Sequence, residues 1–274
     1  MDISAPLNVH VELTFGCNRK CVMCYKQVLN KSGYDFMSLD TARVICSKLR
    51  SSGWNDLKIK FALRGEPLLN PDWFNIIKLF REELSDSILI LTTNGDFLNP
   101  SVAERFFEAG GNFLMVDCYH NTLESRKRLY KDFNVSDYYS DDFDLYTEQS
   151  TEHREIILID DLVLRNGERD TRVISNHGGN IDFDKVADLG IRPLSISLLK
   201  FCMRPFRDLM FFFDGSIPLC CEDSACESVL GNVFSVADLN DLWFNSSKLD
   251  AVRYSLNLNF RLFKPCRNCD YNGG

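Results

Sequence analysis

The stretch LNVHVELTFGCNRKCVMCY, residues 7–25, joins an alternating apolar segment to three closely spaced cysteines. Every second residue from Leu7 to Leu13 is apolar, which is typical of a strand with one buried face. His10 and Glu12 lie between these residues and share the opposite face with Thr14. The segment therefore predicts a first strand that leads directly into a cysteine-rich loop.

The same order of strand and helix repeats along the chain. The patterns predict helices over 38–53, 73–84 and 100–109, and strands over 57–63, 87–92, 112–118, 156–159 and 171–175. Repeats of this kind build a parallel sheet or a barrel. In such folds the loops at the carboxyl ends of the strands carry the chemistry, and the cysteine-rich loop holds one of these positions.

Two regions depart from this repeat. Residues 124–155 are rich in Asp, Tyr and Ser and have weak periodicity, which indicates an insertion or lid. Beyond about residue 197, cysteine, phenylalanine and turn sequences such as DGSIP cluster together. We therefore expect one domain over 1–196 and a smaller one over 197–274.

Composition excludes several classes of partner. The 274 residues carry a formal net charge of −8 and no long run of Lys or Arg, which disfavours nucleic acid and anionic membranes as partners. No apolar stretch approaches the length of a membrane span and no signal sequence is evident, so we expect a cytoplasmic protein. Its 11 cysteines then indicate metal ligation rather than disulfides.

The first cysteine group, Cys17, Cys21 and Cys24, has the pattern C-x3-C-x2-C. Three thiolates on one loop can bind three irons of a 4Fe–4S cluster and leave the fourth iron open for a substrate or cofactor. A zinc site or three unrelated thiols are the alternatives that spacing alone leaves open.

The chain resembles the radical S-adenosylmethionine (SAM) superfamily in this spacing and in the motifs that follow. The resemblance implies a partial (β/α)6 TIM-like barrel, in which the open iron binds SAM. It also implies that the SAM-binding residues are Gly65, Glu66 and Pro67 of the GGEP-type motif, Thr93 and Asn94 of the TNG turn, Asp117, and Met23 and Tyr25 beside the third cysteine.

The second cysteine group consists of Cys202, Cys220, Cys266 and Cys269, and by spacing alone it could also be a zinc ribbon. It resembles the twitch module, a shortened SPASM domain, and the similarity includes LGNV at residue 230 and DLW at residue 241. That resemblance implies a small α/β module holding one auxiliary 4Fe–4S cluster. The expected cofactors are thus SAM and two clusters.

These cofactors imply a radical oxidoreductase that takes a hydrogen atom from an unactivated C–H bond, with a flavodoxin- or ferredoxin-type electron donor. The leading hypothesis is oxidation of a hydroxyl carbon of a small polyol, aminocyclitol or sugar. The TNGDFL and SNxGG segments are similar to those of superfamily members that oxidise 2-deoxy-scyllo-inosamine. Modification of a peptide, or electron transfer without catalysis, are the competing hypotheses.

Oxidation of an alcohol needs a base, and three residues are candidates: His10, Glu12 and His177. Each histidine could instead be packed or solvated without a catalytic role, and Glu12 could form an ion pair with a nearby arginine inside the barrel. Among the remaining cysteines, Cys46 is expected in the core. Others could return a hydrogen atom to substrate, which would make the reaction an epimerisation: the candidates are Cys118 and Cys221.

Overall fold

The structure is a computed structural model of the whole chain. It describes residues 3–21, 24, 32–54, 56–117, 131–133, 135–138, 151–159, 164–165, 168–169, 173–174, 178, 180–181, 183–185, 192–193 and 201–271. Among the helices in these ranges, none is long and apolar enough to cross a membrane.

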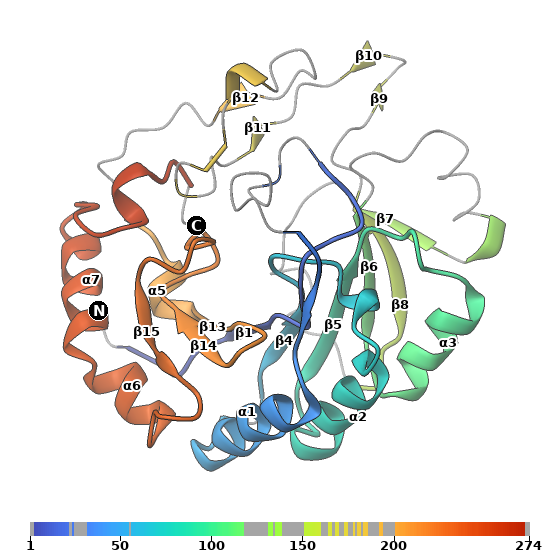
Figure 1. Cartoon of the computed structure of the whole chain (residues 1–274), viewed down its shortest axis with the longest axis horizontal. Coiled ribbons are helices and arrows are strands. Elements are labelled where there is room, and N and C mark those ends of the chain that lie inside the picture. The colour runs from blue at the N-terminus through green and yellow to red at the C-terminus, as the bar shows by residue number, and fades with distance from the viewer. Residues whose placement is uncertain are drawn as a thin grey trace.

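A curved parallel sheet forms the centre of the molecule (Figure 1). In the described part of the chain it has seven strands in the order β13-β1-β4-β5-β6-β8-β7, and every neighbouring pair is parallel. The strands are β1 (Asn8–Val11), β4 (Lys58–Phe61), β5 (Ile88–Thr93), β6 (Phe113–Asp117), β7 (Val135–Tyr138), β8 (Glu155–Ile159) and β13 (Asp208–Phe211). The two edges, β13 and β7, do not pair with each other, so the barrel is partial as the resemblance implies.

Three helices cover the outer face of this sheet (Figure 1): α1 (Leu39–Ser51), α2 (Trp73–Glu83) and α3 (Pro100–Glu108). The Ser38 hydroxyl accepts a hydrogen bond from the Thr41 N–H and caps α1, as the sequence predicts. Asn99 caps α3 in the same way, and Pro100 occupies its first turn. Local sequence therefore sets where these helices begin.

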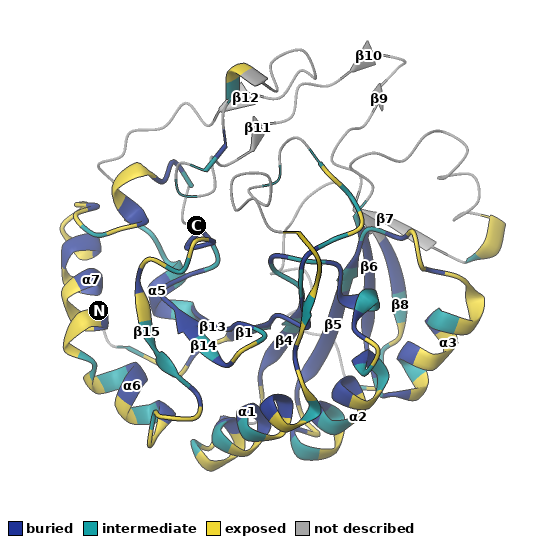
Figure 2. Ribbon diagram, viewed as in Figure 1, coloured by how far each residue is buried: buried dark blue, intermediate teal, exposed yellow. Residues whose placement is uncertain are grey.

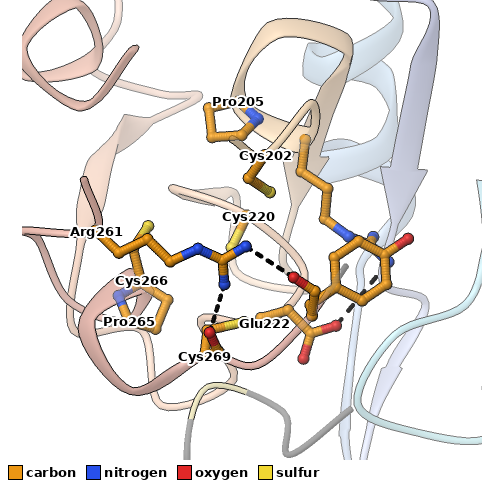
Figure 3. A pocket seen from close by; sticks show the side chains of 10 residues that line it. Cys202, Pro205, Cys220, Glu222, Arg261, Pro265, Cys266 and Cys269 are labelled. Atoms are coloured by element: carbon orange, nitrogen blue, oxygen red, sulfur yellow. Dashed lines mark hydrogen bonds and ion pairs between the residues drawn. The ribbon is translucent and has the colours of Figure 1, made fainter. Parts of the chain in front are cut away.

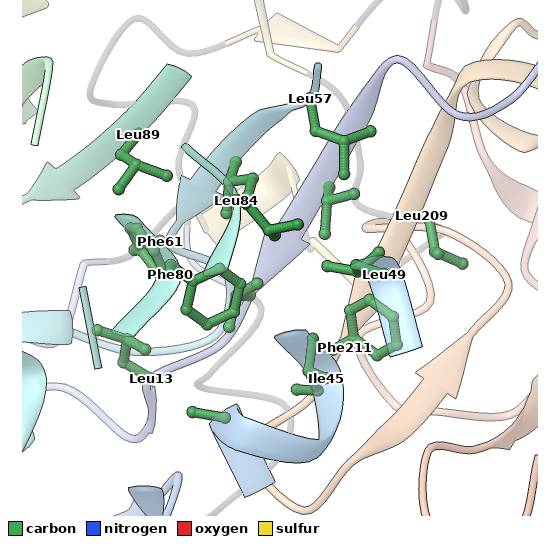
Figure 4. Packing of buried hydrophobic residues seen from close by; sticks show 14 of the residues in the cluster. Leu13, Ile45, Leu49, Leu57, Phe61, Phe80, Leu84, Leu89, Leu209 and Phe211 are labelled. Carbon is green, nitrogen blue, oxygen red and sulfur yellow. The ribbon is translucent and has the colours of Figure 1, made fainter. Parts of the chain in front are cut away.

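The outward side chains of the strands make the main core with these helices (Figure 4). Val9 and Val11 of β1 and Ile59 and Phe61 of β4 are completely buried there. The side chains between them point to the opposite, inner face of the sheet, because direction alternates along a strand. Figure 2 shows the burial of the strands against the exposed outer sides of the helices.

The chain after residue 200 adds shorter elements. They are α5 (Arg204–Arg207), β14 (Ser216–Pro218), β15 (Val229–Asn232), α6 (Leu239–Asn245), α7 (Ser247–Asn257) and the 3-10 turn η7 (Cys266–Asn268). Elsewhere there are small pairs and turns: β2 (Thr14–Phe15), β3 (Asp35–Phe36), η2 (Pro67–Leu69), β9 (Leu164–Arg165), β10 (Glu168–Arg169), β11 (Val173–Ile174), η5 (Phe183–Lys185) and β12 (Arg192–Pro193).

Three sheet assignments differ from the sequence-based expectation. Of the predicted strand at 171–175, the described residues 173–174 form β11, which pairs with β12 outside the main sheet. A further strand, β13, joins the main sheet instead, and the apolar run LMF that follows Asp208 is typical of a strand buried on both faces. The stretch 124–155, expected as an insertion or lid, contributes the edge strand β7.

Truncating Phe61 tests the packing of the outer core. Phe61 is completely buried and meets Phe80 of α2 edge to face, with 5.2 Å between ring centroids. We expect Phe61→Ala to lower the free energy of unfolding by about 3–5 kcal/mol because a cavity remains. Tyr254→Ala, at a side chain 70% exposed, should change it by less than about 0.5 kcal/mol. Urea unfolding measures both, and equal effects would contradict this packing.

Candidate cluster and cofactor site

The loop that carries Cys17, Cys21 and Cys24 starts at the carboxyl end of β1, where the sequence places it. All three thiols are partly exposed and none is in a disulfide. The Cys24 N–H donates to the Cys21 carbonyl oxygen at 2.9 Å, and the Arg19 N–H points to the Cys17 sulfur at 3.4 Å. The loop thus folds back on itself and brings the cysteines to one region.

Gly65 lets the GEP loop pass directly beneath the cysteine loop. Gly16 and Gly65 form an isolated parallel bridge, and the Glu66 N–H donates to the Gly16 carbonyl oxygen at 3.1 Å. A Cβ atom on Gly65 would lie 2.1 Å from the Thr14 carbonyl oxygen and 2.5 Å from that of Gly16. Both are backbone atoms, so a side chain here could be accommodated only by displacing the cysteine loop, and the position strongly favours glycine.

Glu66 ties the GEP loop to the TNG turn. Its buried carboxylate accepts hydrogen bonds from the Thr93 hydroxyl at 2.7 Å, the Asn94 N–H at 2.8 Å and the Leu68 N–H at 3.1 Å. Burial raises the pKa of Glu66, and these hydrogen bonds act against that shift. The Glu66 side chain therefore holds the GEP loop and the TNG turn together. Because that side chain is occupied, the GEP loop would contact a cofactor through its backbone.

The TNG turn also reaches the cysteine loop. The Asn94 side-chain amide donates to the Asn18 oxygen at 2.8 Å and points to the Cys17 sulfur at 3.5 Å. Asp96 accepts from the Arg19 guanidinium and from the Asn18 amide, at 2.8 Å and 2.7 Å. The three motifs that the sequence analysis grouped are thus in direct contact.

The chemistry of the cysteine loop fits an iron–sulfur cluster. Burial, followed by the neighbouring Cys24 and Cys17 sulfurs, raises the pKa of Cys21 to about 12. Such a thiol needs a cationic centre beside it to become a ligand. Three cysteines on one loop can bind three irons of a 4Fe–4S cluster and leave the fourth iron open.

Asp117 is the last residue of β6 and is partly exposed. It therefore lies at the same end of the parallel sheet as the cysteine loop. Its charge contributes to the raised pKa of Cys21, which places it near the cysteine loop. The other predicted residues of this region, Met23, Tyr25 and Cys118, lie outside the described residues, and so does His177.

Glu12 forms a buried ion pair with Arg64, which is the alternative that the sequence left open. The guanidinium donates to both carboxylate oxygens at 2.7 Å, and the Arg64 and Phe213 N–H groups donate to them at 3.1 Å and 3.2 Å. Arg64 also donates to the Ser224 carbonyl oxygen at 3.1 Å and stacks between the rings of Phe15 and Phe212. Because Arg64 and two backbone N–H groups already occupy its carboxylate, Glu12 is better suited to joining these segments than to accepting a proton from substrate.

His10 faces the inside of the barrel, partly exposed, two residues before Glu12. Burial lowers the pKa of His10 to about 3; Asp208 opposes this shift, while Lys60, Arg204 and Arg207 reinforce it. The imidazole is therefore neutral near pH 7. A group with so low a pKa is a weak general base, although it can donate and accept hydrogen bonds.

The four cysteines of the second group surround one cavity after residue 200 (Figure 3). Burial raises the pKa of Cys202 and Cys220, and it raises the pKa of Cys266 to about 12 and that of Cys269 to about 11. Four thiols that line one cavity, and whose ionisation a positive centre would favour, fit the predicted auxiliary cluster.

Sequence reasoning missed the charged wall of this cavity, formed by Arg204, Glu222, Arg261 and Tyr271. Arg261 donates to the carbonyl oxygens of Cys269 and Tyr271. Arg204 covers the Tyr271 ring at 3.9 Å, approaches Glu222 at 3.9 Å and hydrogen bonds to the Cys221 sulfur. The one available signal was the placement of Arg204, Glu222 and Tyr271 within two positions of cysteines; Arg261 lies five positions from Cys266 and had no such signal. Cys46, by contrast, is buried in the core as predicted.

Gly65→Ala tests the contact between the loops. Because the added methyl group would meet two backbone oxygens, the cysteine loop must shift, and a displacement near 1 Å costs about 100-fold in rate. We expect SAM cleavage, measured as 5′-deoxyadenosine released under dithionite, to fall by about that factor. Gly53→Ala, just after α1, is the control: nothing lies within 4 Å of its added Cβ atom, and its φ of 75° confines the cost to local backbone strain, so SAM cleavage by the folded protein should be unchanged. Full activity of Gly65→Ala would contradict this account.

Glu12→Gln tests the buried ion pair. The substitution leaves the Arg64 charge buried beside a neutral amide, which should cost about 3–5 kcal/mol of unfolding free energy. Asp40→Asn removes the equivalent carboxylate from the exposed Asp40–Arg43 pair and should cost less than about 1 kcal/mol. Chemical denaturation measures the two changes, and a cost for Glu12→Gln as small as the control would argue against a structural role.

Sequence comparison identifies two known domains. The pattern of the Radical SAM superfamily matches residues 11–141, and that of SPASM, an iron–sulfur cluster-binding domain, matches residues 202–270. The S-adenosyl-L-methionine-dependent 2-deoxy-scyllo-inosamine dehydrogenase of Niallia circulans is 23% identical over 96% of this chain and 92% of that protein. The AdoMet-dependent heme synthase of Methanosarcina barkeri (strain Fusaro / DSM 804) is 31% identical over 41% of this chain, a match that spans 31% of that protein.

Solved structures share the fold. A crystal structure of BtrN in complex with AdoMet and 2-DOIA matches with a TM-score of 0.75 and 22% identity, over 99% of this chain and 95% of that one. Native anSMEcpe with bound AdoMet and Cp18Cys peptide matches with a TM-score of 0.54 and 16% identity, over 97% and 87%. The chain therefore carries a Radical SAM superfamily domain followed by a SPASM-type domain, which makes it a radical SAM enzyme that uses SAM and two iron–sulfur clusters.

Proposed function

We propose that this radical SAM enzyme oxidises a hydroxyl-bearing carbon of a small polyol, aminocyclitol or sugar, with the auxiliary cluster as electron acceptor. The similarity to a 2-deoxy-scyllo-inosamine dehydrogenase along 96% of the chain supports this class of substrate. The related complex of BtrN contains 2-DOIA, a small molecule, within the same fold.

The observation that carries the proposal is how close the auxiliary cavity lies to the inside of the barrel. Arg204 lines that cavity, and its guanidinium is 3.8 Å from the Asp208 carboxylate at the start of β13. Asp208 in turn accepts a hydrogen bond from Asn8 of β1 at 2.7 Å and influences His10. An electron leaving a substrate inside the barrel would thus have an acceptor beside the neighbouring strand.

We assign the ligands and contacts on this basis. Cys17, Cys21 and Cys24 would hold the first cluster, and Cys202, Cys220, Cys266 and Cys269 the auxiliary one. The loops at Gly65–Pro67 and Thr93–Asn94, with Asp117, Met23 and Tyr25, would line the SAM site. The functional division would lie near residue 196, between the barrel and the auxiliary module.

When bound, SAM and the first cluster supply a carbon-centred radical that removes a hydrogen atom from an unactivated C–H bond. The chain itself must position the target carbon, exclude water and accept the hydroxyl proton. We assign the proton acceptor to His177, because Glu12 is fully paired and the pKa of His10 is too low. Its neighbour Gly178 supports the assignment: a Cβ there would lie 2.7 Å from the Glu222 carbonyl oxygen, beside the auxiliary cavity.

The electron donor would be a flavodoxin- or ferredoxin-type protein, in keeping with one-electron chemistry, and we place the enzyme in the reducing cytoplasm, without nucleic acid or membrane partners. A peptide substrate is less well supported. It rests on the likeness to anSMEcpe, whose TM-score of 0.54 is lower than that of BtrN at 0.75.

The decisive experiment follows a hydrogen isotope. Anaerobically reconstituted enzyme is given SAM, dithionite and 2-deoxy-scyllo-inosamine, or a panel of related polyols and sugars, deuterated at the alcohol carbons. We expect deuterium in the released 5′-deoxyadenosine and a ketone product, and about eight irons per chain.

Two variants locate the steps. Replacing Cys17, Cys21 and Cys24 by Ala should remove about four irons and abolish SAM cleavage, whereas replacing Cys202 and Cys220 should also remove about four but stop ketone formation while some cleavage continues. Deuterium transfer without a ketone would replace oxidation by epimerisation. If deuterium were transferred from a peptide and from none of the small molecules, the peptide-modifying hypothesis would be favoured. If the reconstituted protein cleaved no SAM, the proposal of an enzyme would be refuted.

A further inference from the structure

The cavity that the four auxiliary cysteines line must accommodate negative charge. Four thiolates would enter it with a cluster, and reduction of that cluster adds one further electron. Three of the four cysteines, Cys220, Cys266 and Cys269, are buried, and burial disfavours the form that carries more charge. Without positive groups beside it, a cluster held here would be a poor electron acceptor.

Backbone hydrogen bonds supply part of the compensation. Burial raises the pKa of Cys202, and the Arg204 N–H, which donates to its sulfur, acts against this shift. Burial and the Glu222 charge raise the pKa of Cys269, and the Tyr271 N–H opposes them in the same way. Donors directed at ligand sulfurs raise the reduction potential of an iron–sulfur cluster, because they stabilise the form with more negative charge.

Arg204 brings a full positive charge to the same cavity, since its side chain lines it and an arginine keeps its proton even when buried. The guanidinium is held in place from several sides. It lies 3.8 Å from the Asp208 carboxylate and 3.9 Å from that of Glu222, and it covers the ring of Tyr271. It also hydrogen bonds to the Cys221 sulfur. The charge is therefore fixed beside the cluster ligands.

One hydrogen-bond donor of Arg204 is unused. Its Nε atom is buried and has no hydrogen-bond partner within the part of the chain that the structure describes. Buried N–H groups without a partner are rare in proteins, because they cost free energy. Since the side chain lines the cysteine cavity, the sulfur atoms of a bound cluster are the acceptors that suit this donor.

The side chains around the cavity carry more positive than negative charge. Arg204 and Arg261 line it, and Glu222 is the carboxylate among the described lining residues. Arg261 is tied to the backbone, because it donates to the carbonyl oxygens of Cys269 and Tyr271. Positive charge near a cluster favours its reduced form, and the Glu222 charge acts in the opposite direction.

We infer that Arg204, opposed by Glu222, sets the reduction potential of the auxiliary cluster, and that its positive charge and its unused N–H make the cluster an electron acceptor. In the proposed reaction the substrate radical gives one electron to the cluster and its hydroxyl proton to a base, and a ketone remains. The potential of the cluster determines how far this transfer proceeds. The inference thus rests on the proposed function and names a residue on which its last step depends.

The midpoint potential of the auxiliary cluster is the decisive measurement, because it needs neither SAM nor substrate. The full chain with Cys17, Cys21 and Cys24 replaced by Ala is reconstituted, so that the auxiliary cluster is present by itself. It is titrated anaerobically while electron paramagnetic resonance follows the reduced cluster. We expect Arg204→Gln to favour the oxidised form about 10-fold, a shift of about −59 mV for a one-electron couple. Arg204→Met, which removes the polar group as well, should shift it at least as far.

Three further variants separate the causes. Arg204→Lys keeps the charge but lacks the guanidinium donors, so its shift should be smaller than that of Arg204→Gln. Glu222→Gln removes the opposing charge and should move the potential in the positive direction. Arg43→Leu, which removes an exposed guanidinium on α1, is the control and should leave the potential unchanged.

Iron content of about four per chain verifies that each variant is loaded. If neither neutral variant of Arg204 binds the cluster, the sign of the Glu222→Gln shift decides. The inference is overturned if Arg204→Gln and Arg204→Met keep the redox equilibrium within about twofold of the parent chain. It is also overturned if Glu222→Gln shifts the potential negatively or not at all.

Turnover of the holoenzyme distinguishes this inference from the proposed reaction. Arg204→Gln should form less ketone for each 5′-deoxyadenosine released. A shifted potential in a chain that oxidises no alcohol retains the role of Arg204 and refutes the proposed reaction. Alcohol oxidation together with an unchanged potential does the reverse.

Discussion

The ion pair between Glu12 and Arg64 is the interaction on which the arrangement of this protein rests. It joins the end of β1, the loop after β4, the backbone beyond β13 and the Ser224 carbonyl of the auxiliary module. A buried ion pair contributes little net stability, because desolvation of the two charges offsets their attraction. Removing one partner is costly, however, so the pair favours the one arrangement in which both charges are matched. It fixes how the auxiliary module meets the barrel, and with that the path between the two cluster sites.

Parallel strands explain why one end of the sheet can hold so much chemistry. All seven strands of the described sheet run in the same direction, so the cysteine loop, the GEP loop and the TNG turn all lie at the carboxyl ends of the strands. Glu66 and Gly65 then set their spacing, one by hydrogen bonds and the other by having no side chain.

Sequence alone located five of the seven strands in the described sheet, the three helices α1, α2 and α3, and both cysteine sets, because period and spacing are local signals. Ser38 caps α1 as its position predicts, whereas the Asn99 cap of α3 was not anticipated. The sequence could not show that β13 joins the sheet beside β1, because the paired residues are 200 positions apart in the sequence. The cysteines on either side of β13 also led to its assignment to the second domain. Nor could the sequence decide between a base and an ion pair for Glu12.

The position of β13 has a consequence for how the protein can be divided. Its four residues pair with all four residues of β1, so a chain cut near residue 200 would turn β1 into an open edge. Unpaired N–H and C=O groups along such an edge invite association with other chains. The barrel would then be prone to aggregate without its auxiliary module even where that module's cluster plays no part. The barrel and the auxiliary module therefore form one folding unit, because β13 completes the sheet of the barrel and leads directly into the second cysteine group.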